Sequence, residues 1–132
     1  MSRPKGRVRD CSAADARARL NDARQFLQAA ELLTAAGNGD VVATNAVHAA
    51  IAAADVLCCL ALGRRSADRN HETAVVLLEQ VSSDHANQLR RALARKQQAA
   101  YESRDLADTE ARICVEAARR LTAAATAAVE KL

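Results

Sequence analysis

Proline, glycine and aromatic residues are scarce in this chain of 132 residues. Pro4 is the only proline, and Phe26 and Tyr101 are the only residues among Phe, Tyr and Trp. Because helix breakers are so rare and 33 positions are alanine, the chain after Pro4 favours helix. Residues that favour strands never cluster with a period of two. The sequence therefore predicts an all-α protein, a single antiparallel bundle of four or five helices.

Cysteine spacing argues against a metal site. The cysteines are Cys11, Cys58, Cys59 and Cys114, and none forms the C-x-x-C pair of a structural zinc site. We expect no metal and no cofactor. We recognise no signal peptide, so buried free thiols in a reducing, cytoplasmic protein are the expected state.

One hydrophobic segment is long enough to cross a membrane. It runs from Val41 to Leu62, but it is mostly alanine, and Asn45, His48 and Asp55 interrupt it. Such a segment is weakly hydrophobic for a membrane span. We expect it to be the central helix of a soluble bundle, with no membrane partner.

Positive charge is concentrated at the start of the chain. Residues 1–10 account for the whole net charge of +3, and the rest of the chain is balanced. We expect residues 1–11 to be a flexible basic tail and residues 12–132 to form the bundle. Such a tail either contacts phosphates without sequence preference or only improves solubility.

Capping and turn residues predict where each helix begins and ends. Ser12 with Asp15 begins a first helix that reaches Ala35, and Gly37-Asn38-Gly39 ends it. The other expected helices run from a cap at Asp40 to Leu62, from a cap at Asp68 or Asn70 to Val81, from Ser82-Ser83-Asp84 to Ala100, and from a cap at Asp108 onward. A basic connector, 63–67, and a polar turn, 101–107, join them.

Two stretches resemble HEPN domains, small helical bundles that include stand-alone actinobacterial proteins. The first is 52–66 with Asp68-Arg69-Asn70-His71 behind it, and the second is 95–101 with Asp108-Thr109-Glu110-Ala111 opening the last helix. The resemblance implies a homodimer and a role in RNA-directed defence or in a toxin–antitoxin pair, with a cognate antitoxin as partner. Many HEPN proteins are RNases that carry an Arg, four to six residues, and then a His.

The second stretch departs from that RNase motif at one position. Arg95 matches the arginine and Tyr101 an aromatic position, but Ala100 stands where the histidine is expected. Metal-free cleavage needs a group that moves the 2′-hydroxyl proton, and neither alanine nor a phenol with a pKa near ~10 does so well near neutral pH. The resemblance therefore implies binding of RNA or a nucleotide at a degenerate RNase site, and leaves enzymatic activity uncertain.

Two alternatives to this function remain open. Arg65 and His71 also have the motif spacing, so His71 could supply a displaced base for a metal-independent RNase; otherwise it is polar surface. The other alternative is a dimerising adaptor or regulatory bundle without enzymatic activity.

Polar residues on two of the expected helices are further candidates for the site. Asn45, His48 and Asp55 lie along one line of the second helix, either at its solvent edge or in a cleft where Asp55 pairs with Arg95. The fourth helix carries the basic residues Arg90, Arg91, Arg95 and Lys96, which with Arg64 and Arg65 could bind an RNA backbone or simply face solvent.

Overall fold

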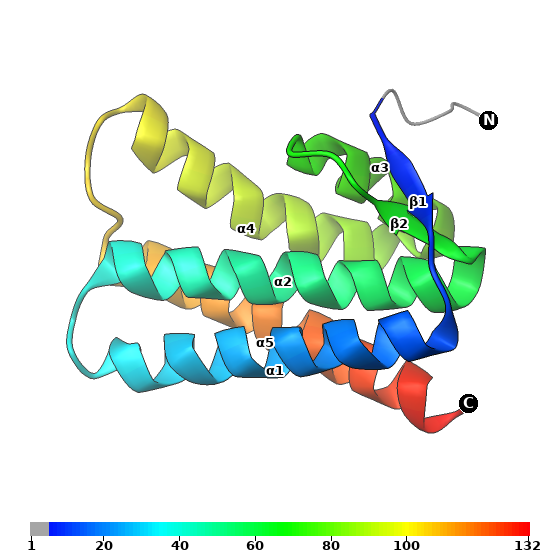
Figure 1. Cartoon of the computed structure of the whole chain (residues 1–132). Helices are drawn as coiled ribbons and strands as arrows, with labels where there is room; N and C mark the ends of the chain where they lie inside the picture. Colours follow the sequence, from blue (N-terminus) through cyan, green and yellow to red (C-terminus); the bar gives the residue numbers. More distant parts are fainter. Residues whose placement is uncertain (1–5) are drawn as a thin grey trace.

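Five helices and one short pair of strands make up residues 6–132, the part of the chain that the computed structural model describes (Figure 1). The helices are α1 (Ala13–Thr34), α2 (Gly39–Leu62), α3 (His71–Val81), α4 (Ser83–Tyr101) and α5 (Asp108–Glu130). The strands β1 (Val8–Asp10) and β2 (Arg64–Ser66) pair antiparallel across the C-terminal end of α2. The prediction of an all-α helical bundle is confirmed.

The second helix, α2, forms the centre of the bundle and packs against each of the other four helices. Its alanines at 49, 50 and 52–54 are completely buried. Alanine side chains are small enough to let several helices approach one axis closely. By length and composition α2 could also cross a membrane, but 67% of its most apolar window is buried inside the protein. This burial agrees with the expected central helix of a bundle.

Side-chain caps explain why several helices start where they do. Ser12 and Asp15 form the expected capping box, with bonds of 3.1 Å and 2.9 Å to each other's backbone N–H groups. Asn70 caps α3 by accepting from the backbone N–H of Glu72, and Ser82 caps α4 through His85. At the other end of α2, Gly63 adopts a left-handed φ of 70°, which glycine tolerates best.

Three helix starts or ends differ from the prediction. The last helix begins at Asp108 with Ala107 as its N-cap, so Asp108 is the first helical residue and not the cap. The second helix begins at Gly39 with Asn38 as its cap, while the carboxylate of Asp40 accepts instead from the backbone N–H of Leu106. The fourth helix continues through Tyr101, which the sequence had placed in a turn. The Asp40 difference depends on a contact with a residue 66 positions away, which local patterns do not encode, and the Tyr101 difference lies within the usual uncertainty of helix ends.

The expected flexible tail is wrong for residues 8–11. Val8 to Asp10 form β1, whose partner β2 lies in the connector that was expected to be without strands. Cys11 donates its backbone N–H to the carbonyl of Gly63 at 3.0 Å and forms a disulfide with Cys59. The part of the predicted tail over residues 1–5 lies outside the described residues.

The disulfide also corrects the prediction of four free thiols. Cys58 and Cys114 are buried free cysteines, as expected, but Cys11 and Cys59 are not. Because disulfides persist mainly in oxidising surroundings, the cysteines no longer support a reducing cytoplasm. A cytoplasmic location stays a prediction.

Candidate functional site: a cationic pocket on the central helix

Asp55 is a buried carboxylate in the middle of the apolar helix α2. Only 3% of the residue is exposed. Its Oδ2 accepts a hydrogen bond of 2.9 Å from Nε of Arg19 and one of 3.5 Å from Nη1 of Arg65. Burial nevertheless outweighs the attraction of these guanidiniums and raises the pKa of Asp55 above its usual value. Asp55 thus holds two arginines from different elements at one place.

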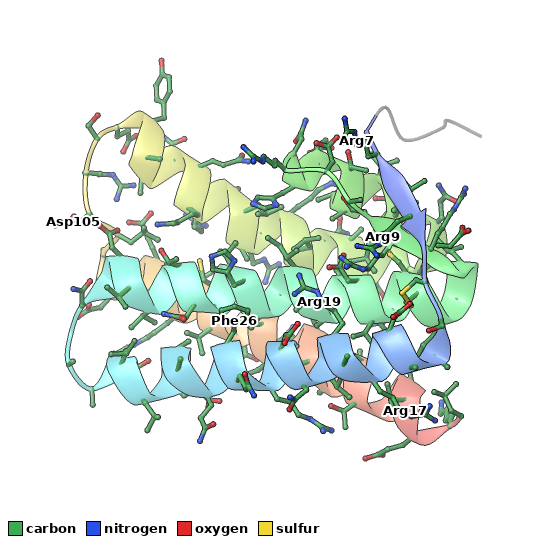
Figure 2. The ribbon with its side chains drawn as sticks, viewed as in Figure 1. Arg7, Arg9, Arg17, Arg19, Phe26 and Asp105 are labelled. Atoms are coloured by element: carbon green, nitrogen blue, oxygen red, sulfur yellow. A yellow bond between two sulfur atoms is a disulfide. The ribbon has the colours of Figure 1, made fainter. Side chains whose placement is uncertain are left out.

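The two arginines come from two different elements that pack on α2. Arg19 lies on α1, on the same stripe as Ala23 and Phe26, and also contacts Asp22 at 3.3 Å. Arg65 is the central residue of β2, directly opposite Arg9 of β1. Figure 2 shows Arg9 and Arg19 near the C-terminal half of α2, on the side where β1 and α1 approach it. The pairing of β1 with β2 therefore brings a third arginine to the same region.

These side chains surround a hollow of about 340 Å³, called here the cationic pocket. Its lining residues are Arg9, Arg19, His48, Ile51, Asp55, Arg65, Ser66, Ala67, Asp68, His71 and Ala74. Three arginines and two histidines face two aspartates, and the carboxylate of Asp55 is already bonded to two of the arginines. Such a pocket attracts anions.

His48 lies on the same face of α2 as Asp55, seven residues or about two turns earlier. Its ring stacks on Phe26 with 5.1 Å between ring centroids. The His48 side chain is exposed at the rim of the pocket, but partial desolvation of its ring, followed by the positive charges of His71, Arg19 and Lys96, lowers its pKa from the usual value. The imidazole is therefore mainly neutral near neutral pH and can accept a proton there.

His71 reaches the pocket from α3, of which it is the first residue. The cap at Asn70 fixes the start of that helix, and His71 is half-buried beside the pocket. The sequence had offered either a displaced base or polar surface for this residue. The structure places it at the pocket together with Arg65 and Asp55.

The predicted site on α4 is not assembled. Tyr101 is 88% exposed, Arg95 is exposed, and neither lines one of the hollows described in residues 6–132. Asp55 pairs with Arg19 and Arg65, so the suggested Asp55–Arg95 pair does not form. Ala100, at the position of the missing histidine, is exposed as well.

The other basic residues of α4 point to different places. Arg91 borders a separate hollow of about 190 Å³ against α5. Lys96 is half-buried and close enough to His48 for its charge to lower that residue's pKa. Of the α4 cluster, Lys96 is therefore the member whose charge reaches the cationic pocket.

Asp55, Arg65 and His71 were predicted from the sequence, and Arg9 was expected only as part of a basic tail that could contact phosphates. Arg19 and the role of His48 were not predicted. A weak signal for Arg19 was present, because it continues the stripe of Ala23 and Phe26 along α1. No local signal exists for Arg9, since its place depends on pairing with residues more than fifty positions later.

Among residues 6–132, no group of three or more His, Cys, Asp or Glu side chains is arranged to hold a metal ion. Comparison with protein-family models, curated proteins and solved structures finds no match to the chain. The resemblance to HEPN domains therefore stays a prediction that rests on the residues quoted above.

Proposed function

We propose that the cationic pocket binds the phosphate groups of RNA or of a nucleotide. The observation that carries this proposal is the convergence of Arg9, Arg19 and Arg65 with two histidines around one hollow. Guanidinium groups bind phosphate oxygens in a fixed, bidentate geometry. A volume of about 340 Å³ also lies in the range of small-molecule sites.

The arginines retain donors for such a ligand. A guanidinium has five N–H donors. Arg19 uses Nε toward Asp55 and Nη1 toward Asp22, which leaves its Nη2 free of acceptors within residues 6–132. Arg65 uses Nη1 toward Asp55 and the carbonyl of Ser66, which leaves Nε and Nη2. Both side chains are about one quarter exposed, at 27% and 25%, so solvent and ligands have access to them.

Binding of labelled single-stranded RNA, measured by fluorescence anisotropy in the presence of a metal chelator, tests the proposal. Unlabelled RNA and a nucleoside triphosphate, added separately as competitors, distinguish the two sources of phosphate. Because Arg65 contacts phosphate, Arg65→Gln should weaken binding and lower the salt dependence of log K by about 0.7, the share of one contact on a single strand.

Arg120→Gln is the matched control, because this exposed arginine on α5 pairs with Glu116 and neither residue lines the pocket. It should leave affinity close to wild type. Equal losses in Arg65→Gln and Arg120→Gln would mean that RNA senses only overall charge, and would contradict a pocket-specific site. No binding of either ligand by the wild-type protein would rule the function out.

His48 and His71 both line the cationic pocket, which favours a second candidate function, metal-independent RNA cleavage. In that reaction His48, with its lowered pKa, takes the proton of the ribose 2′-hydroxyl as the oxygen attacks the adjacent phosphorus. His71 gives a proton to the leaving 5′-oxygen, while Arg65 stabilises the charge on the phosphorane oxygens. This differs from the sequence-based alternative, which used His71 alone as the base.

Incubation of labelled RNA with chelator tests the cleavage candidate. His48→Gln and His71→Gln should each abolish cleavage, whereas Arg95→Gln should retain it because Arg95 lies outside the pocket. Intact RNA with the wild-type protein would leave binding as the function and remove cleavage.

The biological role implied by the HEPN resemblance is a further part of the proposal. A defence or toxin–antitoxin role, a cognate antitoxin and a homodimer are all compatible with an RNA-directed pocket. Sedimentation of the purified chain tests the homodimer directly.

A further inference from the structure

The strand that carries Arg9 is held in place by a short pairing and by hydrogen bonds of the residues beside it, Arg7 and Cys11. It has three residues, all exposed, and its strand partner is β2. An isolated pair of short strands is at best marginally stable in water. Immediately after the strand, Cys11 is bonded through sulfur to Cys59 near the end of α2. The peptide chain continues from this strand through Cys11 and Ser12 into α1, and the disulfide adds a second covalent tie, to the end of α2.

Arg9 occupies a shared border of two hollows. The cationic pocket includes Arg9, Arg19 and Arg65, and the same three arginines line an adjoining hollow of about 160 Å³ with Asp15, Ala18 and Asp22. In the strand register Arg9 faces Arg65 directly. Two like charges side by side repel each other, and an anion between them relieves that repulsion. The position therefore suits a phosphate group bridging Arg9 and Arg65.

We propose that Arg9 is a phosphate-binding residue of the cationic pocket, and that the Cys11–Cys59 disulfide keeps it there. The inference rests on the proposed function and adds redox control to it. With the disulfide intact, β1 presents Arg9 to the ligand. With the disulfide reduced, β1 is held by its short pairing with β2, by the flanking hydrogen bonds from Cys11 to Gly63 and from Ala67 to Arg7, and by its peptide link to α1. Arg9 then leaves the pocket for part of the time.

Reduction by a dithiol gives a balanced reaction. Cys11 is half-buried and Cys59 is 4% exposed, so a dithiol thiolate attacks the sulfur of Cys11. The S–S bond breaks, and Cys59 leaves as a thiolate that takes up a proton. The second thiol of the reductant then attacks the mixed disulfide and releases Cys11 as a thiol. Two electrons pass from the dithiol, which becomes a disulfide, to the protein.

The neighbouring free cysteine does not interfere with this exchange. Cys58 is buried, and that burial, with Asp55 nearby, raises the pKa of its thiol to about 12. Only the thiolate form attacks a disulfide. The Cys11–Cys59 pair is therefore stable against reshuffling with Cys58 and responds instead to an external dithiol.

The test compares the full-length protein in oxidised and dithiol-reduced forms, with affinity for labelled single-stranded RNA and for a nucleoside triphosphate as readouts. Oxidised Arg9→Gln should weaken binding by about tenfold, the effect of losing one charge-assisted contact, and should no longer respond to the reductant. Reduction of the wild type should weaken binding by less than this, because Arg9 leaves the pocket only part of the time. Cys114→Ser, which removes a buried free thiol of α5, should respond as wild type does.

A second measurement follows the strand without any ligand. Amide hydrogen exchange of residues 8–10 should speed up on reduction, while the amides of α5 keep their protection, which shows that the bundle stays folded. Should reduction unfold the bundle, oxidised Arg9→Gln still tests the role of Arg9.

The outcomes separate this inference from the proposed function. Oxidised wild type that binds neither RNA nor nucleotide overturns both. Oxidised wild type that binds in an Arg65-dependent way, with no effect of Arg9→Gln or of reduction, overturns only the role of Arg9 and its disulfide.

Discussion

At the level of single residues, His48 couples the cationic pocket to pH. Partial desolvation and the charges of His71, Arg19 and Lys96 keep its folded pKa below the ordinary value of about 6.5. A phosphate bound in the pocket would place negative charge near His48 and so raise its pKa. Binding and protonation therefore support each other, and affinity for RNA or nucleotide should increase as pH falls from about 7 to about 5.

Titration of affinity against pH measures this coupling. In His48→Gln, affinity for RNA or nucleotide should increase less as pH falls than it does in wild type. His85→Gln, which changes a histidine on α4 outside the pocket, is the control and should follow the wild-type curve. Identical curves for wild type and His48→Gln would mean that His48 takes no part in binding.

In the ligand-free protein, His48 should make the free energy of unfolding decrease as pH falls, whereas ligand affinity increases as pH falls. A lowered folded pKa means that the unfolded chain binds the proton first, so this contribution is present above about pH 6.5 and is lost as pH falls below it. Asp55 acts with the other sign in more acidic solution, because burial raises its pKa. The difference in Tm between wild type and His48→Gln isolates the histidine: wild type should lose more of its Tm toward acid. A constant difference across the range would contradict the lowered pKa.

Helical spacing predicted two residues of the candidate site but not their partners. The line of His48 and Asp55 was visible because a helix repeats its faces at fixed spacing, and a carboxylate among alanines stands out. The partner of Asp55 was not visible, and Arg95 was the wrong choice. Partner identity depends on how α1 and β2 dock on α2, which helical spacing within α2 does not specify.

At the level of elements, α2 depends on small side chains on every side. Ala53 is fully buried, and its neighbours Ala52 and Ala54 are as well, so no face of this turn has room for a larger residue. Ala53→Leu should lower the free energy of unfolding by about 1–3 kcal/mol through overpacking. Urea denaturation measures the loss. Ala123→Leu, at an exposed position of α5, is the control and should change stability little. Equal stability for both variants would contradict tight packing around α2.

The start of α2 depends on the absence of a side chain at Gly39. A Cβ built there would overlap the carbonyl oxygen of Leu106, in the segment that joins α4 to α5. Gly39→Ala should therefore move backbone, weaken the bond from Leu106 to Asp40, and cost about 1–3 kcal/mol in a urea titration. Gly37→Ala is the comparison: it has open space but a φ of 74°, so only conformational strain opposes it. A larger loss in Gly37→Ala than in Gly39→Ala would count against the contact with Leu106.

The starts of several helices were predictable because their capping residues lie within three positions of the amides they bond. Ser12 with Asp15, Asn70 and Ser82 mark helix starts because each cap bonds an amide within three residues. The pair of strands was missed, since three-residue strands carry no period and their register joins Val8 to Ser66 across two helices. Non-local pairing of this kind emerges only when the bundle has brought its ends together.

At the level of the whole molecule, the disulfide ties the first described residues to the end of the central helix. It joins positions separated by 48 residues, a segment that contains α1 and most of α2. In the unfolded chain this link removes conformations that the reduced chain can adopt. By the chain-entropy model, a loop of this length stabilises the folded state by about 4 kcal/mol, and measured values for disulfides are commonly ~2–4 kcal/mol.

Reduction should therefore lower the urea midpoint without dissolving the bundle, because the packing of α1 on α2 involves buried side chains such as Ala16, Leu20 and Ala23 rather than the cysteines. The denaturant slope should rise slightly, since the released unfolded chain exposes more surface. Cys11→Ser should reproduce both effects without reductant, whereas Cys114→Ser should leave the response to reductant intact. A midpoint that is the same with and without dithiol would show that the link does not constrain the unfolded chain in solution. If the midpoint falls as expected while α2 keeps its helical signal, the disulfide is a constraint added to an already complete core, and the cell can open it without losing the protein.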